Sequence, residues 1–123
     1  MKSKVLKPTF SRHDERVDFF EMLNGLRWEN ISYGKMKKGA IMGNHYHKKT
    51  GVFFFILSGL ATVKIMHVKS KKRESLLLAS NEGIIFDKNS SHAIIFSEES
   101  LFLMGKEKTY NKEKPDTYPY VVT

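Results

Sequence analysis

The sequence contains no cysteine among its 123 residues, which excludes disulfide bonds and thiolate metal ligands. Any metal ion would have to be held by nitrogen and oxygen ligands. No run of residues approaches the ~20 apolar positions that a transmembrane helix needs. The basic start MKSKVLKPTF also lacks the apolar centre of a signal peptide. We therefore expect no membrane association and a cytoplasmic location.

Acidic residues are few relative to basic ones. The chain carries 21 Lys and Arg residues against 13 Asp and Glu residues, a formal net charge of +8. This excess favours anionic partners, such as phosphorylated metabolites or nucleic acid. The lysines fall mainly in expected loops and near the chain ends, and no basic helix face or arginine-rich arm is present. Nucleic acid is therefore the weaker hypothesis for the partner.

Helical patterning is scarce, with one short candidate at residues 18–23, whereas period-two alternation dominates the chain. Short apolar runs are separated by turn signals such as Ser58-Gly59. The expected strands cover residues 26–36, 40–45, 51–57, 61–68, 73–79, 83–86, 93–96 and 101–105. Many short strands without helical crossovers predict an all-β fold, an antiparallel sandwich or barrel.

The length suits one domain with one core. We expect an N-terminal arm at residues 1–25, an antiparallel β-barrel at residues 26–105 and a C-terminal extension at residues 106–123. Pro115 and Pro119 exclude a central strand from the extension. Its tyrosines need burial, so the extension is expected to pack on the barrel or on a partner subunit.

One expected strand is apolar on both sides. Val52, Phe54 and Ile56 share one side, and Phe53, Phe55 and Leu57 share the other. Such a strand is typical of burial on both faces, between two sheets or between a sheet and a partner subunit. Together with short sheet edges, this pattern favours a homodimer.

Three histidines are candidates for chemistry. His45 and His47 are two residues apart, so on a strand both imidazoles project to one side. We expect the chain to turn at residues 48–51 and to return as the antiparallel partner of that strand. His92 begins a later strand, and a curled sheet would bring all three imidazoles together. Three such nitrogens suit zinc or a related divalent ion, and without a metal they suit acid–base chemistry.

The order of these residues resembles two motifs of the cupins. In the first cupin motif a His-x-His pair is followed by a Glu and then a Gly; here His45-Tyr46-His47 is followed by Val52 and Gly59. In the second, a Gly leads through a Pro-x-Gly-like turn to a His; here Gly83 leads through Asn89-Ser90-Ser91 to His92. The resemblance covers about residues 26–105 and implies a single jelly-roll-like cupin barrel.

The cupin resemblance also implies a metal site, with two departures. Val52 occupies the position of the family's Glu ligand and cannot bind a metal, and the turn before His92 lacks the usual Pro and Gly. Three histidine ligands remain, namely His45, His47 and His92. Two roles of the three histidines therefore stay open. They could hold one divalent ion such as zinc, or they could perform acid–base chemistry without a metal.

A narrower resemblance concerns function. The runs GNHYH and KEKPDTYPYV are similar to the cupin portion of capsular and surface polysaccharide-biosynthesis enzymes, and the same barrel class contains epimerases and isomerases of nucleotide-linked keto sugars. The resemblance implies that His45 is the base beside the keto group and that His47 orients substrate or metal. We expect Arg27, Lys48 and Lys49 to contact phosphate, and Tyr33 to stack on the substrate.

A different function class stays open beside the enzyme. The chain could be a non-catalytic cupin that binds a metal ion or a sugar and assists a partner enzyme. The missing Glu ligand at Val52 favours this alternative, whereas the three histidines favour the enzyme.

Overall fold

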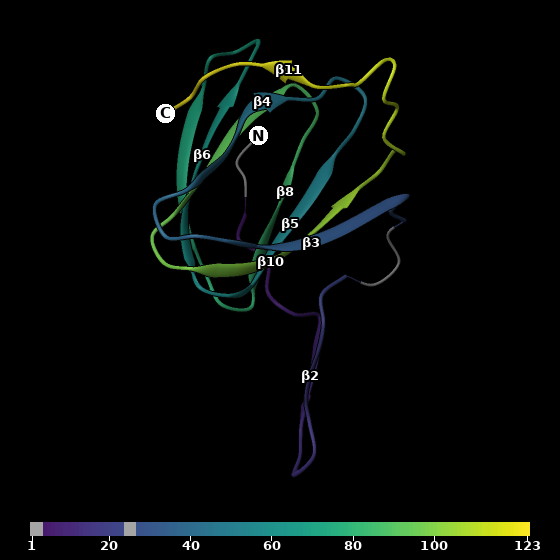
Figure 1. The fold of residues 1–123 in the computed structure, drawn as a ribbon, viewed down its shortest axis with the longest axis vertical. Coiled ribbons are helices and arrows are strands. Elements are labelled where there is room, and N and C mark those ends of the chain that lie inside the picture. The colour runs from purple at the N-terminus through teal and green to yellow at the C-terminus, as the bar shows by residue number, and fades with distance from the viewer. Residues whose placement is uncertain (1–3, 24–26) are drawn as a thin grey trace.

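A computed structural model describes residues 4–23 and 27–123, and this part of the chain is built from strands without an α-helix (Figure 1). The strands are β1 (Phe10–His13), β2 (Asp18–Glu21), β3 (Asn30–Met36), β4 (Ile41–Tyr46), β5 (Val52–Ser58), β6 (Leu60–His67), β7 (Arg73–Ala79), β8 (Glu82–Phe86), β9 (Ser90–Phe96), β10 (Ser100–Lys106) and β11 (Tyr118–Pro119). The expected all-β fold is confirmed. None of the described residues forms a helix that could span a membrane.

Two antiparallel sheets face each other and enclose the core, as in a jelly roll (Figure 1). One sheet has the strand order β3-β10-β5-β8, and the other has the order β11-β4-β9-β6-β7. The expected return of the chain after residues 48–51 is wrong in detail. There the chain crosses from β4 in one sheet to β5 in the other, so these two strands do not pair. The crossing lets inward side chains of both sheets contribute to one interior.

The core lies between the inner faces of the two sheets. Val52, Phe54 and Ile56 of β5 are inside this cluster and are at most 1% exposed. The outward Phe53 is also buried, beneath the ring of Trp28 at 5.9 Å. The expected burial on both faces is thus confirmed for residues 52–56, and residues of the same chain provide the outer cover. It is wrong for Leu57 near the end of the strand, which is 44% exposed.

The short helix expected at residues 18–23 is wrong. Residues 18–21 form β2, which pairs with β1 in a hairpin that stands away from the barrel (Figure 1). One or two turns of isolated helix are unstable in water, whereas the hairpin partner satisfies the backbone groups. The expected boundary of the barrel at residue 26 lies outside the described residues.

The C-terminal residues lie across the sheet that contains β4. Tyr118 and Pro119 form β11, which pairs with Tyr46 and His45 of β4. Farther on, Val122 is 8% exposed and packs on the outer face of this sheet. The tail therefore adds a short strand directly beside the His-x-His segment.

Candidate functional site

A β-bulge in β4 aims the first two histidines into the barrel. Met42 faces the core opposite Ile94, so plain alternation would turn His45 outward. The pairing register shifts between Gly43 and His45, and the extra residue, Asn44, reverses the phase. The sequence therefore places His45 inward only because Gly-Asn precedes it.

The residue types at this bulge are those that its backbone needs. Gly43 has φ +111°, and a Cβ there would lie 2.4 Å from the carbonyl oxygen of His92. Asn44 has φ +61°, a left-handed conformation that asparagine tolerates better than most residues. The side-chain oxygen of Asn44 also accepts a hydrogen bond from the Val122 amide at 2.9 Å. The bulge is thus fixed both by the strand beside it and by the tail.

Three imidazoles converge inside the barrel. His45 lies opposite His92 in the β4–β9 register, with ring centroids 4.9 Å apart, and His47 lies 5.1 Å from His45. The nitrogen atoms that could bind a metal all lie within 4.8 Å of one another. The ring of Phe86 stacks on His92 at 4.0 Å and closes the site from the core side. The structure thus brings together all three histidines that the sequence singled out.

The tail fixes the tautomer of His47. The Nδ1 atom of His47 lies 2.6 Å from the backbone carbonyl oxygen of Asp116, which can only accept a hydrogen bond. Nδ1 therefore carries the proton, and the lone pair of the neutral ring is on Nε2. The Asp116 carboxylate accepts hydrogen bonds from the Lys48 and Lys49 amides at 3.0 and 2.8 Å, which holds the tail against the turn after β4.

All three imidazoles are neutral near pH 7. Burial, and then the charges of neighbouring groups, lower the pKa of His45 to about 4 and that of His92 to about 3. Burial also lowers the pKa of His47, although the Asp116 carbonyl opposes this effect. Neutral imidazoles are the form that accepts a proton or binds a metal. The site is therefore a set of free bases.

Lys106 is a site residue that the sequence reasoning missed. It follows Phe102 and Met104 on the inner face of β10, and its positive charge lowers the pKa of all three histidines. It also lines the same cavity as His47. The sequence signal for Lys106 was the alternation along β10. Phe102 and Met104 are apolar and face the core, so Lys106, two residues farther on, shares their face.

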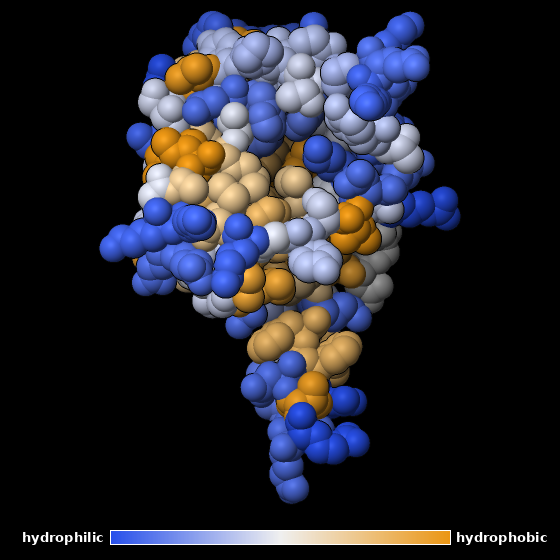
Figure 2. Space-filling model, viewed as in Figure 1, coloured by the Kyte–Doolittle hydropathy of each residue, from blue (hydrophilic) through white to orange (hydrophobic). Residues whose placement is uncertain are grey.

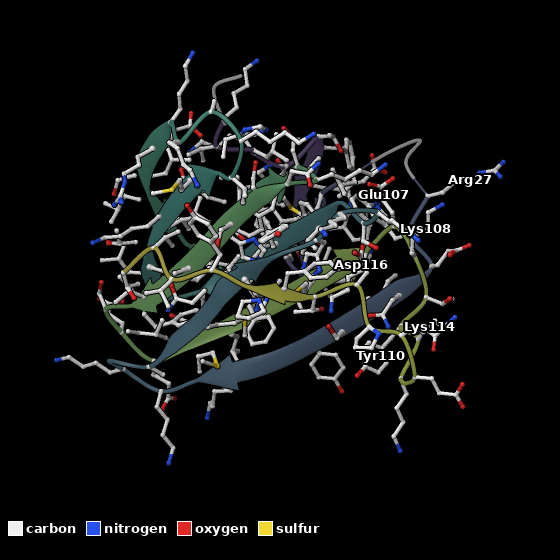
Figure 3. All side chains as sticks on the ribbon, turned by 90° about the horizontal axis from the view of Figure 1, so that it is seen from above. Arg27, Glu107, Lys108, Tyr110, Lys114 and Asp116 are labelled. Carbon is white, nitrogen blue, oxygen red and sulfur yellow. The ribbon has the colours of Figure 1, made fainter. Side chains whose placement is uncertain are left out.

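A cavity of about 360 Å³ opens beside His47, between the end of the barrel and the segment at residues 106–117. Asp116, Lys108, Tyr110 and Lys114 lie together at this end of the barrel (Figure 3). Its lining residues are His47, Lys49, Thr50, Lys106, Lys108, Thr109, Tyr110, Asn111, Lys114, Asp116 and Thr117. The cavity carries four lysines, and His47 is the member of the triad that lines it.

The four expected substrate-binding residues have different positions. Lys49 lines the cavity beside His47. Lys48 is exposed, and its ammonium lies 4.2 Å from the ring centroid of Tyr118, outside the cavity lining. Arg27 points away from the barrel (Figure 3), and Tyr33 is 82% exposed on β3. The structure thus brings only Lys49 to the histidines.

The residues present fit a divalent metal in part. Three neutral imidazoles are suitable donors, and a carbonyl partner on the second nitrogen, as in His47, is common for metal-bound histidine. Val52 is 1% exposed among apolar residues, so no carboxylate replaces the usual Glu there. The nitrogen separations, up to 4.8 Å, exceed the ~4 Å that two zinc–nitrogen bonds can span. The triad could hold an ion after a small inward movement of its side chains.

The fold and the inward histidines define a cupin-type barrel, which confirms the resemblance seen in the sequence. More narrowly, the chain belongs to the family of polysaccharide biosynthesis C-terminal domains, which matches residues 12–118. No curated protein sequence shows a significant match to the chain.

Solved structures with the same fold come from sugar-nucleotide enzymes and capsule proteins. A 3,4-ketoisomerase from Helicobacter canadensis superposes with a TM-score of 0.79 at 20% identity, over 95% of this chain and 90% of its own. The dTDP-6-deoxy-D-glucose-3,5-epimerase RmlC from Legionella pneumophila, in complex with dTDP-4-keto-L-rhamnose, gives 0.76 at 17% identity, over 91% and 70%.

A third similar structure belongs to a longer protein. The capsular polysaccharide assembling protein CapF from Staphylococcus aureus superposes with a TM-score of 0.72 at 21% identity over 92% of this chain. The chain spans 32% of the length of CapF, about a third. At such identities, the similarity to all three structures shows a shared fold.

Proposed function

We propose that this chain acts on a nucleotide-linked keto sugar in surface polysaccharide biosynthesis, as an epimerase or isomerase. The observation that carries the proposal is the triad of neutral, inward imidazoles beside the ammonium of Lys106 and a cationic cavity. The family match to polysaccharide biosynthesis domains and the fold shared with a ketoisomerase and an epimerase support it.

His45 is the base in this proposal. It is less enclosed than His92 and His47, and its ring lies 5.1 Å from that of His47, the histidine that lines the cavity. A hydrogen on the carbon next to a ketone is weakly acidic, and a neutral imidazole can accept it when it lies within hydrogen-bonding reach. The lowered pKa of His45 keeps its imidazole unprotonated near pH 7, so its lone pair is available to accept the proton.

Lys106 and His47 complete the proposed chemistry. Removal of the proton leaves an enolate, whose oxygen carries negative charge, and the ammonium of Lys106 would stabilise that charge. The Asp116 carbonyl orients His47, so that its Nε2 faces the interior as an acceptor for a substrate hydroxyl. Return of the proton by His45 to the former carbonyl carbon, with the hydroxyl proton passing between the two oxygens, moves the keto group. A proton from water that reaches the opposite face of the original carbon gives an epimer instead.

Solvent deuterium tests this proposal. A keto-sugar nucleotide incubated with the protein in deuterated water should gain deuterium at the carbon beside the keto group. His45→Gln should abolish the gain, because glutamine keeps hydrogen-bonding capacity and cannot act as the base. Exchange that survives the substitution would remove His45 from the role.

A non-catalytic metal- or sugar-binding cupin is the second candidate, and the triad geometry favours the metal. His45, His47 and His92 would hold one divalent ion such as zinc, which would supply Lewis-acid polarisation of an oxygen. Elemental analysis of the purified protein tests this candidate. A stoichiometric ion that is lost in His92→Gln would support it, and an ion content near zero after incubation with zinc would remove it.

We also propose a homodimer, which the β1–β2 hairpin supports. All residues of β1 are exposed, and so are Phe19 and Phe20 of β2. Figure 2 shows hydrophobic surface on this hairpin. A lone two-stranded hairpin is at best marginally stable in water, so this one needs a cover. A second copy provides one, because Ile31 on the edge strand β3 is also exposed and apolar.

A further inference from the structure

Four lysines converge on the cavity beside His47. They are Lys49, Lys106, Lys108 and Lys114, and they come from two parts of the chain, the turn after β4 and the segment that starts at the end of β10. We infer that this cavity, roofed by residues 106–117, binds the nucleoside diphosphate part of the substrate. The lysines hold the two phosphates, and Tyr110 stacks on the base. This inference rests on the proposed function and assigns its nucleotide subsite.

The charge of the cavity is strongly positive. Among the lining residues, Asp116 is the one carboxylate against four ammonium groups. Its oxygens already accept hydrogen bonds from the Lys48 and Lys49 amides at 3.0 and 2.8 Å. The carboxylate of Asp116 is therefore engaged with the backbone, and the lysines are left to bind an anion. A diphosphate supplies the charge that they match.

The loop that roofs the cavity is held by hydrogen bonds from backbone amides. The amide of Gly51 donates to the Glu107 carboxylate at 2.7 Å, and the amide of Thr109 donates to the Glu29 carboxylate at 3.2 Å. The side-chain oxygen of Asn111 accepts hydrogen bonds from the amides at positions 113 and 114, which closes a turn. These bonds fix the backbone of the loop that carries Lys108 and Lys114 before a ligand arrives, which lowers the entropic cost of binding.

The geometry assigns the two ends of the ligand. His47 and Lys106 line the inner end of the cavity and belong to the barrel interior, so the sugar lies on that side. Tyr110 is 61% exposed, lines the same cavity and lies close to Lys114 (Figure 3). An exposed ring beside a diphosphate site is suited to stacking on a base. A volume of about 360 Å³ falls within the range of small-molecule sites.

Calorimetric titration with dTDP, UDP and inorganic pyrophosphate tests the inference. The double variant Lys108→Ala/Lys114→Ala should weaken binding of all three by about tenfold or more, because charge-assisted hydrogen bonds are lost. Tyr110→Ala should weaken both nucleotides and leave pyrophosphate unchanged, whereas Tyr110→Phe should restore nucleotide binding. The matched control is Lys37→Ala/Lys38→Ala, which removes two exposed lysines at a turn outside the cavity and should leave affinity unchanged.

Several outcomes would overturn the inference. One is that neither dTDP nor UDP binds. Another is that the two double lysine variants, both with an unchanged melting temperature, lose the same affinity. A third is that a single-stranded oligonucleotide binds more tightly than either nucleotide. Deuterium exchange separates this inference from the proposed function. Exchange with a KM unchanged in Lys108→Ala/Lys114→Ala would remove the subsite alone. Nucleotide binding without exchange would keep the subsite and remove the enzyme.

Discussion

At the scale of single residues, Val52 distinguishes this site from the usual cupin pattern. It lies opposite Phe86 in the β5–β8 register, and the Phe86 ring stacks on His92. The sequence alone shows that a valine side chain cannot bind a metal. It does not show that Lys106 lies near the histidines, because that depends on which end of the barrel β10 reaches.

Restoring a carboxylate at position 52 should create metal affinity. Val52→Glu places an ionisable group in the core, so without metal we expect the free energy of unfolding to fall by about 2–4 kcal/mol. Zinc should recover this loss, because an ion that binds the folded state stabilises it. Thermal melts with and without zinc measure both effects. Val52→Gln is the control; it should be destabilised and gain nothing from zinc, and a matching gain would contradict the account.

The histidines should make stability depend on pH. Burial lowers the pKa of His45 from 6.5 to about 4 and that of His92 from 6.5 to about 3. Between these values the unfolded chain binds more protons than the folded chain, so stability is full above about pH 6.5 and falls as the pH decreases through this window. Urea unfolding at several pH values should show a smaller decrease in His92→Asn. Parallel curves for the two proteins would contradict the shift.

At the scale of elements, the bulge in β4 explains what the sequence could predict and what it could not. The His-x-His spacing correctly predicted that His45 and His47 share a face. The pattern alone did not show which face, because Met42 already points inward and a regular strand would turn His45 to the outside. The signal was Gly43-Asn44, two residues that tolerate left-handed backbone.

Gly43→Ala should disturb the site as well as the fold. An added Cβ would lie 2.4 Å from the His92 carbonyl oxygen at φ +111°, so we expect a loss of about 2–4 kcal/mol in stability. The matched control is Gly39→Ala, at φ +86° with no atom within 4 Å of the added Cβ. It should cost only the backbone strain, about 1 kcal/mol. Equal losses in chemical denaturation would argue against the tight contact of β4 with β9.

The C-terminal tail carries a second element-scale lesson. Asp116 orients His47 through its carbonyl group and holds the turn after β4 through its carboxylate. Composition and periodicity gave no reason to select it, because both contacts cross nearly 70 positions of sequence. The resemblance of KEKPDTYPYV to surface polysaccharide enzymes was the one hint that this segment contributes to the site.

At the scale of the whole molecule, alternation and turn residues were sufficient to predict the all-β class. They did not predict the route of the chain, since the step from β4 to β5 between sheets and the β1–β2 hairpin depend on tertiary packing. The hairpin also shows why residues 18–23 were misread, because a short apolar stretch fits a helix or a strand equally well.

The hairpin should control assembly. Light scattering during size-exclusion chromatography should give twice the mass of the chain for the unchanged protein. Phe10→Ser/Phe19→Ser should shift the protein to the monomer mass, because the two rings, 6.3 Å apart, lose their apolar contact surface. Leu77→Ser, which changes a residue of β7 that is 60% exposed, should leave the dimer intact. A monomer without any substitution, or a dimer in both variants, would contradict the proposed interface.

Proton transfer by His45 is the central claim, and deuterium incorporation measures it most directly. The protein is incubated with a nucleotide-linked 4-keto sugar in deuterated water, and the carbons beside the keto group are followed by NMR. We predict exchange with the unchanged protein and with the control His67→Gln. His67 contacts Ser70 and lies outside the triad. We predict none with His45→Gln. The account would be contradicted if the unchanged protein gave no exchange with keto sugars linked to any of several nucleotides. Equal exchange with His45→Gln would contradict it as well.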